Sequence, residues 1–139
     1  MRVFKITSNN IGLEMIASIG KDKINGARSV FEGIVRDNND GLKVKKLEYE
    51  CYESLAINEG DLILKEAIKK FGVNNAICIH RIGTLEIGDT AVIVLVNSGH
   101  RDESFKACRY IIDEVKIRVP IWKKEYYLDG ESDWLKSAG

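Results

Sequence analysis

Alternating apolar and polar residues mark several strands along the chain. The two kinds of side chain alternate over residues 28–36, 44–52 and 121–128, with the period of a strand that has one buried face. Residues 90–96 are nearly all apolar and mostly β-branched, which predicts a central strand covered on both faces. Two further short strands are predicted at residues 2–7 and 76–82.

Apolar residues at helical spacing predict three helices, over residues 12–19, 55–71 and 103–117. Ser54 is the predicted N-cap of the second helix, and Gly72 is expected to end it. Gly60 lies inside that helix and costs about 1 kcal/mol relative to alanine, so we expect an irregular beginning. Pro120 ends the third helix, because the residue before a proline disfavours the helical conformation.

The order of these elements predicts an α+β fold with a mixed sheet and packed helices, because hairpins and helices are interspersed. Residues 37–41 are polar and tolerate left-handed backbone, which predicts a hairpin between the strands at 28–36 and 44–52. Residues 83–89 are predicted to form a loop. No repeat or flexible linker interrupts the chain, and its 139 residues fit a single domain over 1–139.

Charge and composition exclude two classes of protein. Lys plus Arg and Asp plus Glu both number 21, so the formal net charge is zero and no overall positive field is available for nucleic acid. A local basic patch remains compatible with this balance. Hydrophobic residues make up 45% of the chain, which excludes a disordered protein.

Cysteine usage and the absence of long apolar runs lead us to expect a cytoplasmic protein without a metal site. Cys51, Cys78 and Cys108 are odd in number and form no CxxC pair, which favours a reducing compartment over a disulfide framework. Cys78 and His80 have no second pair of ligands beside them, so zinc is not expected. The N-terminus does not resemble a signal peptide, and the longest apolar run, residues 91–96, is too short for a bilayer.

The first candidate site is the turn at residues 97–102, which follows the predicted central strand and opens a helix. A helix N-terminus presents free N–H groups and a positive dipole end, and with His100 and Arg101 it would suit an anion. An ordinary helix start, capped by Asp102 and carrying two exposed basic residues, explains the same pattern. Ser98 lies in no GxSxG motif, so a serine nucleophile is poorly supported.

The second candidate site is basic and contains Lys116, Arg118, Lys123 and Lys124, around the end of a helix and the start of a strand. Lys116 follows the inward-facing Val115, which places it at the core boundary. A partly buried lysine has a lowered pKa and can carry protons or attack a carbonyl. Lys123 and Glu125 share one face of the strand. The alternative is that lysines in a last helical turn simply complement the helix dipole.

A third candidate is the end of the strand at residues 28–36. Gly33 inside a strand indicates a bulge or a close approach by a ligand. Arg36 lies at the strand end, before a polar loop. The alternative for Arg36 is that it is an ordinary arginine on an edge strand. Cys108 lies in a predicted helix, where an inert buried thiol is favoured over a nucleophile.

Five segments together resemble, in order and spacing, the large catalytic subunits of molybdopterin synthase, the MoaE family. They are FEGIVRD at 31–37, HRIG at 80–83, GD at 88–89, SGHR at 98–101 and KIRVPIWKKE at 116–125. The resemblance covers residues 28–134, and it is specific because all five occur together. It implies an α+β fold of the α/β-hammerhead type.

The resemblance also implies an activity and partners. Such a subunit is a sulfurtransferase: it moves sulfur from the thiocarboxylated C-terminal Gly-Gly of a small ubiquitin-like, MoaD-like carrier subunit to cyclic pyranopterin monophosphate (precursor Z). The product is the dithiolene of molybdopterin, in molybdenum cofactor biosynthesis. A homodimer of large subunits with a carrier at each end, a heterotetramer, is implied. No metal or organic cofactor is expected, because the sulfur arrives on the carrier.

The resemblance assigns roles to residues at matching motif positions. Lys116 and Lys123 are the implied catalytic residues. The implied substrate-binding residues are Ile34, Val35, Arg36, His100, Arg101, Lys116, Lys123, Lys124 and Glu125. The family's pocket draws on both protomers, so His100 and Arg101 are expected to serve the neighbour's site.

Two features qualify the resemblance. His80 and Arg81 match a family motif, but we interpret both as structural. Residues 130–134 carry acidic residues where the family commonly has a basic residue before a tryptophan. Two other functions also fit the sequence: a non-catalytic binding module for a phosphorylated small molecule or a carrier tail, and a plain structural dimer.

Overall fold

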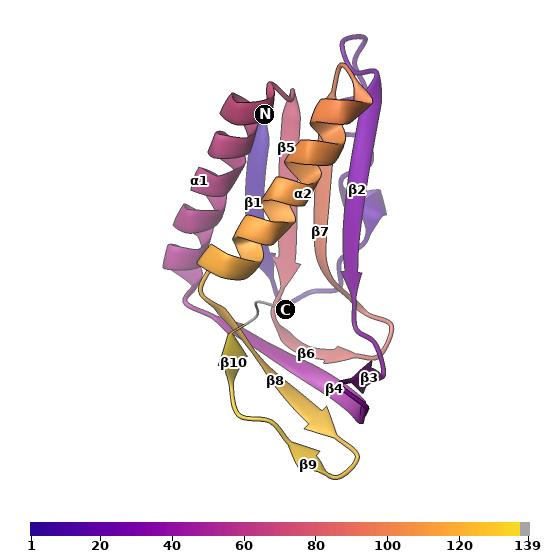
Figure 1. The fold of residues 1–139 in the computed structure, drawn as a ribbon, viewed down its shortest axis with the longest axis vertical. Helices are drawn as coiled ribbons and strands as arrows, with labels where there is room; N and C mark the ends of the chain where they lie inside the picture. Colours follow the sequence, from indigo (N-terminus) through magenta and orange to yellow (C-terminus); the bar gives the residue numbers. More distant parts are fainter. Residues whose placement is uncertain (137–139) are drawn as a thin grey trace.

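The computed structural model describes residues 1–136 as two β-sheets and two long helices (Figure 1). The helices are α1 (Glu53–Phe71) and α2 (Arg101–Arg118). The first sheet has the strand order β1 (Arg2–Thr7), β5 (Asn75–Arg81), β7 (Thr90–Ser98) and β2 (Ala27–Ile34). The second sheet has the order β10 (Leu135–Lys136), β8 (Ile121–Tyr127), β4 (Leu42–Cys51) and β3 (Asn38–Asn39), with β6 (Gly83–Glu86) beside β4 and β9 (Gly130–Glu131) beside β8.

The expected α+β class with a mixed sheet is confirmed. β1 runs parallel to β5, whereas β5 and β2 are both antiparallel to β7. Both long helices lie on one face of the first sheet, and the second sheet continues from its lower end in Figure 1. The two sheets therefore meet near the C-terminal end of α2.

β7 is the central strand that the apolar run predicted. Val92, Val94 and Val96 face the helices and join the main core. Ile93 and Leu95 face the other way, into a second apolar cluster. All five side chains are buried, because the helices cover one face of the sheet and part of the segment between β1 and β2 covers the other.

The predicted hairpin between residues 28–36 and 44–52 is wrong. β2 pairs with β7 in the first sheet, and β4 pairs with β8 in the second. The polar turn instead joins β3 to β4, and Asp40 and Gly41 have φ values of 50° and 81°. The left-handed turn was thus predicted correctly, but long-range pairing with β7 and β8 decided which strands lie side by side.

Residues 12–19 form no α-helix, contrary to the prediction. Only Leu13–Met15 form a 3₁₀ turn, and Ile11 and Ile16 on either side pack beneath the first sheet. An irregular segment can direct both isoleucines into that cluster. Residues 83–86, predicted as loop, form β6, because β4 offers them an open edge.

Both long helices begin earlier than the sequence predicted. Tyr52 is the N-cap of α1 in place of Ser54, and no side chain caps it. His100, not Asp102, is the N-cap of α2. The ends were predicted correctly: Gly72 caps α1 in a left-handed conformation, and α2 stops two residues before Pro120. Neither these helices nor any other in residues 1–136 has the length and apolarity to cross a membrane.

Gly60 does not interrupt α1, which runs regularly through it. A Cβ atom at this position would overlap the aromatic ring of Phe4 on β1. The glycine therefore permits the close approach of α1 to the first sheet, and its weak helix propensity is offset by this contact.

We expect Gly60→Ala to lower the free energy of unfolding by about 1–3 kcal/mol, although alanine is the better helix former. The reason is steric overlap with Phe4. Urea denaturation should measure the loss, and the same substitution in a Phe4→Leu background should cost less. Equal costs in both backgrounds, or a gain in stability, would contradict the explanation.

Candidate active site

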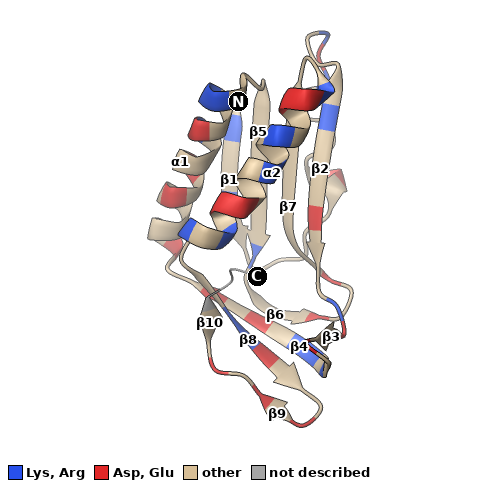
Figure 2. Cartoon of the chain, in the orientation of Figure 1, with Lys and Arg blue, Asp and Glu red and all other residues tan. Residues whose placement is uncertain are grey.

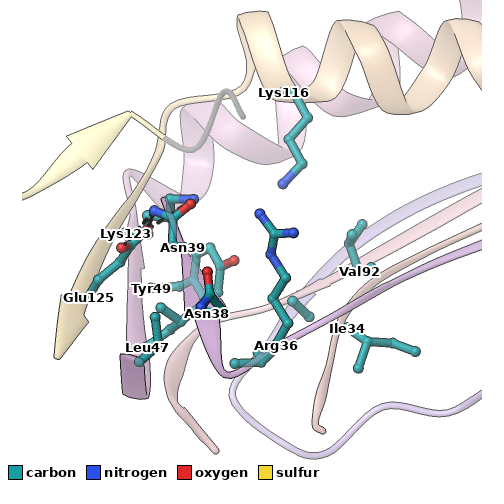
Figure 3. Close-up of a pocket in the computed structure, with 14 residues that line it drawn as sticks. Ile34, Arg36, Asn38, Asn39, Leu47, Tyr49, Val92, Lys116, Lys123 and Glu125 are labelled. Atoms are coloured by element: carbon teal, nitrogen blue, oxygen red, sulfur yellow. Dashed lines mark hydrogen bonds and ion pairs between the residues drawn. The ribbon is translucent and has the colours of Figure 1, made fainter. Parts of the chain in front are cut away.

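A pocket of about 150 Å³ lies where the two sheets meet, beside the last turn of α2 (Figure 3). Six of the nine residues that the family resemblance implied for substrate binding line it: Ile34, Val35, Arg36, Lys116, Lys123 and Glu125. They come from the end of β2, from α2 and from β8. Residues more than 80 positions apart in the sequence are thus brought into one cavity.

The end of β2 is shaped to present Arg36. The pairing with β7 shifts between Gly33 and Ile34, which confirms the predicted bulge. Val35 then leaves the sheet, and its backbone N–H donates to the carbonyl of Asp89, 2.9 Å away. Its carbonyl accepts from the N–H of Gly88 at 2.7 Å. These two bonds fix the backbone before Arg36, whose side chain extends into the pocket in Figure 3.

The last turn of α2 is anchored by an ion cluster around Arg118. Its guanidinium contacts Glu59 at 2.8 Å, Glu66 at 2.7 Å and Glu114 at 3.3 Å. Hydrogen bonds from Arg118 and Tyr110 hold the pKa of Glu66 at about 2, so this carboxylate stays ionised. The cluster ties α2 to α1 and thereby fixes the turn that carries Lys116.

Lys116 projects from this turn into the pocket without a carboxylate partner among residues 1–136. Burial lowers the pKa of Lys116, and the nearby positive charge of Lys123 lowers it further. Both effects disfavour the ammonium form. More of this lysine is therefore neutral near pH 7 than of an exposed lysine, so it can accept a proton.

Lys123 differs from Lys116 because it has an acid beside it. Its Nζ lies 3.5 Å from Oε1 of Glu125, which is only 2% exposed. Asn39 donates from Nδ2 to both carboxylate oxygens at 2.9 Å, and Tyr127 donates its hydroxyl at 2.6 Å. Burial alone would raise the pKa of Glu125, but these hydrogen bonds and the charge of Lys123 outweigh it and hold the pKa below its usual value.

Hydrogen bonds from the acidic segment after β8 hold the backbone of Glu125 in place. Ser132 and Glu125 exchange two bonds of 2.8 Å: the N–H of Glu125 donates to Oγ of Ser132, and the N–H of Ser132 donates to the carbonyl of Glu125. Glu131 pairs with Lys124 at 3.2 Å. Glu131 and Ser132, in the segment 130–134 where the sequence analysis expected a departure from the family pattern, thus hold the strand that carries Lys123 and Glu125.

Three of the implied residues lie outside the pocket. Lys124 points to the opposite face of the second sheet, where it lies over the ring of Tyr126. His100 and Arg101 are at the other end of α2, which is about 27 Å long at about 1.5 Å per residue. Within one protomer they cannot reach the ligand that Lys116 would contact.

Seven pocket residues were assigned to no candidate site by the sequence analysis: Asn38, Asn39, Val44, Leu47, Tyr49, Ala91 and Val92. Asn39 belongs to the polar turn, and Tyr49 lies on β4 directly opposite Lys123. Neither belongs to a motif that we singled out. The only signal for Tyr49 was its position on the apolar face of a predicted strand, which does not separate a core tyrosine from a pocket tyrosine.

The contacts of His80 and Arg81 agree with a structural role. His80 is almost fully buried, and burial lowers its pKa to about 4, so the ring is neutral. Its Nδ1 lies 2.8 Å from the carbonyl of Arg81. Arg81 pairs with Asp89 at 3.0 Å and so holds the turn that fixes Val35.

The charge of the pocket is a local feature. Figure 2 shows acidic and basic residues intermixed along both helices and the second sheet. Within the pocket, Arg36, Lys116 and Lys123 face a single acid, Glu125. Residues 1–136 contain no cluster of three or more His, Cys, Asp or Glu that could hold a metal ion. Three basic side chains against one acid suit the pocket to an anionic ligand.

Fold and site define a small α+β protein with a cationic pocket at the junction of two sheets. The chain matches the family described as MoaE protein over residues 6–118, and it belongs to that family.

Curated relatives in this family carry the name molybdopterin synthase catalytic subunit. The protein of Pyrococcus abyssi is 46% identical, over 88% of this chain and 82% of its own length. The protein of a Nostoc species is 41% identical, over 95% of this chain and 81% of its own length. Among solved structures, molybdopterin synthase from Staphylococcus aureus superimposes with a TM-score of 0.88 at 38% identity, and covers 96% of this chain and 97% of that one.

A complex of subunits 1 and 2 of molybdopterin-converting factor from Helicobacter pylori has the same fold. The TM-score is 0.75, with 96% of this chain and 88% of that one covered. At 22% identity this likeness bears on the fold alone.

We expect Lys123→Ala to raise the pKa of Lys116, because removing a neighbouring positive charge makes the ammonium form less unfavourable. The rate at which trinitrobenzenesulfonate modifies Lys116, followed by mass spectrometry against pH, reports the neutral fraction. The pH at which Lys116 is modified at half its maximal rate should be higher in the variant. Lys124→Ala removes a charge one position away on the opposite face and should leave the midpoint in place. An unchanged midpoint in Lys123→Ala would show that the two lysines do not interact.

Proposed function

We propose that this chain is the catalytic subunit of a molybdopterin synthase. It transfers sulfur from the thiocarboxylated C-terminus of a small ubiquitin-like carrier subunit to cyclic pyranopterin monophosphate. The observation that carries the proposal is the convergence of Arg36, Lys116 and Lys123 in one pocket. The family name, shared by relatives over most of their length, supports the same reaction.

The pocket provides what this reaction needs from the protein. The thiocarboxylate supplies the sulfur nucleophile, so the chain itself has to bind the phosphorylated pterin and move protons. Arg36 and Lys123 offer positive charge to the phosphate and to oxygen that gains negative charge. Lys116, whose pKa is lowered, is the group placed to accept and return a proton.

The free cysteines are compatible with a cytoplasmic location. Cys51, Cys78 and Cys108 are all unpaired thiols, and Cys78 is fully buried. Thiols of this kind persist in a reducing compartment. We propose the cytoplasm on this basis.

Lys116→Ala should lower kcat by about 100-fold or more and change KM by less than a few-fold, as expected for a group that moves protons. The assay mixes the chain with thiocarboxylated carrier and cyclic pyranopterin monophosphate, and detects the oxidised fluorescent product. Lys65→Ala, on the exposed face of α1, is the matched control and should behave as the wild type. A raised KM with kcat intact would instead assign Lys116 to binding. No product from the wild type, with carrier binding intact, would favour the non-catalytic binding module.

We also propose a homodimer, formed along β2. This strand is at the edge of the first sheet, and within residues 1–136 no strand pairs with its outer side. Val30 and Phe31 are partly exposed on it, and Phe105 is exposed on α2. A groove of about 620 Å³ is lined by residues of both elements. A second copy would cover this apolar edge.

A two-fold axis across the middle of β2 would also complete the site. β2 and α2 run in the same direction along the molecule in Figure 1. The axis reverses that direction in the partner, so the start of the partner's α2 would lie near the end of β2 in the first protomer. His100 and Arg101 would then approach the pocket of the other protomer.

Mixed dimers should test this arrangement. Lys116→Ala and Arg101→Ala dimers should each be weakly active, because every site lacks one of the two side chains. After subunit exchange, a mixed dimer contains one site with both side chains, so activity should return to about half of wild type per mixed dimer. No recovery after verified exchange would mean that both residues act within one protomer.

A further inference from the structure

Tyr49 is held rigidly at the base of the pocket. It lies on β4 opposite Lys123, and only 5% of it is exposed. Its ring meets the ring of His80 edge-on, with centroids 5.2 Å apart and planes at 73°. Since His80 is itself buried, the ring of Tyr49 has little freedom to turn away from the cavity.

The hydroxyl of Tyr49 has no hydrogen-bond partner among residues 1–136. Three other tyrosines differ in this respect: Tyr110 donates to Glu66, Tyr126 to Glu48 and Tyr127 to Glu125. The oxygen of Tyr49 is not one of the fully enclosed polar atoms that lack a partner, among which residues 1–136 include only Nε of Arg81, so it reaches the open space of the pocket. Figure 3 shows the Tyr49 side chain turned towards Arg36, on the ligand side of the pocket.

The pocket therefore contains two kinds of polar group. Glu125 is engaged with both Lys123 and Asn39. Arg36 and Lys116 make no ion pair or hydrogen bond within the described chain, and Tyr49 shares this property. Groups without a partner that face one cavity are available to a ligand, and Lys123 keeps donor hydrogens beyond its one contact with Glu125.

We propose that Tyr49 is a further substrate-binding residue of this site, whose hydroxyl donates a hydrogen bond to an oxygen of the phosphorylated pterin. The proposal rests on the proposed function for the identity of the substrate. The phosphate and the pterin ring can each supply the oxygen.

The chemical state of Tyr49 suits this role. Burial, with the negative charge of Glu125, raises the pKa of Tyr49 to about 12. The hydroxyl thus remains a neutral donor across the physiological pH range. It adds direction to a pocket in which Arg36 and Lys123 supply charge, and a directional donor discriminates against analogues that lack the matching oxygen.

The test is Tyr49→Phe, which keeps the ring against His80 and removes only the hydroxyl. We expect about a 10- to 100-fold loss in affinity for cyclic pyranopterin monophosphate by calorimetry, and a similar loss in kcat/KM. Tyr126→Phe removes a hydroxyl from the opposite face of the same sheet and is the matched control. The thermal midpoint of Tyr49→Phe and its binding to the carrier should equal those of the wild type. Inorganic phosphate is the second probe: a parallel loss of its affinity assigns the contact to the phosphate, and an unchanged affinity assigns it to the pterin.

The outcomes separate this proposal from the proposed function. Product formation with equal affinity in Tyr49→Phe and wild type overturns the role of Tyr49 and leaves the function standing. Binding without product in the wild type, weakened in Tyr49→Phe, overturns the function and supports the contact. Absence of wild-type binding overturns both. If Tyr49→Phe does not fold, ¹³Cζ-tyrosine NMR of the wild type decides, because substrate must shift the Tyr49 signal.

Discussion

β7 is buried on both faces, and the positions of the other elements follow from covering it. A strand of this kind cannot tolerate water on either side, so one face requires the two helices and the other requires Ile11 and Ile16. β2 and β5 satisfy its two edges. With α2 fixed across this sheet, the end of α2 must lie where the chain passes into the second sheet, and that junction is the pocket.

The two lysines of the pocket have opposite electrostatic surroundings. Lys123 is placed beside a buried carboxylate that Asn39 and Tyr127 keep ionised, so its positive charge is compensated. Lys116 has no such acid, and burial and the charge of Lys123 both act against its ammonium form. One lysine thus has a fixed carboxylate partner and the other is suited to moving a proton, although both belong to the same motif.

Three residues outside the pocket hold the backbone segments that carry its side chains. Arg118 fixes the turn that carries Lys116, Asp89 fixes the backbone before Arg36, and Ser132 fixes the backbone of Glu125. Ser132 lies in the segment 130–134, which carries acidic residues. The neighbouring residue Glu131 forms an ion pair with Lys124 on the outer face of the sheet. This ion pair offsets the charge of Lys124, whereas Arg36 and Lys116 in the pocket have no carboxylate partner among residues 1–136.

The sequence by itself determined the fold class, the buried central strand, the ends of both helices and the motif residues, because these depend on local periodicity, turn chemistry and short spacings. It also gave the left-handed turn at Asp40 and Gly41 and the bulge after Gly33. Only the tertiary structure decided that β2 pairs with β7 and not with β4, since register between distant strands depends on which apolar faces can be covered together. For the same reason it alone placed Asn39 and Tyr49 in the pocket and separated Lys124, His100 and Arg101 from it. A spacing along the chain fixes the face of an element on which a side chain lies, but packing fixes what that face meets.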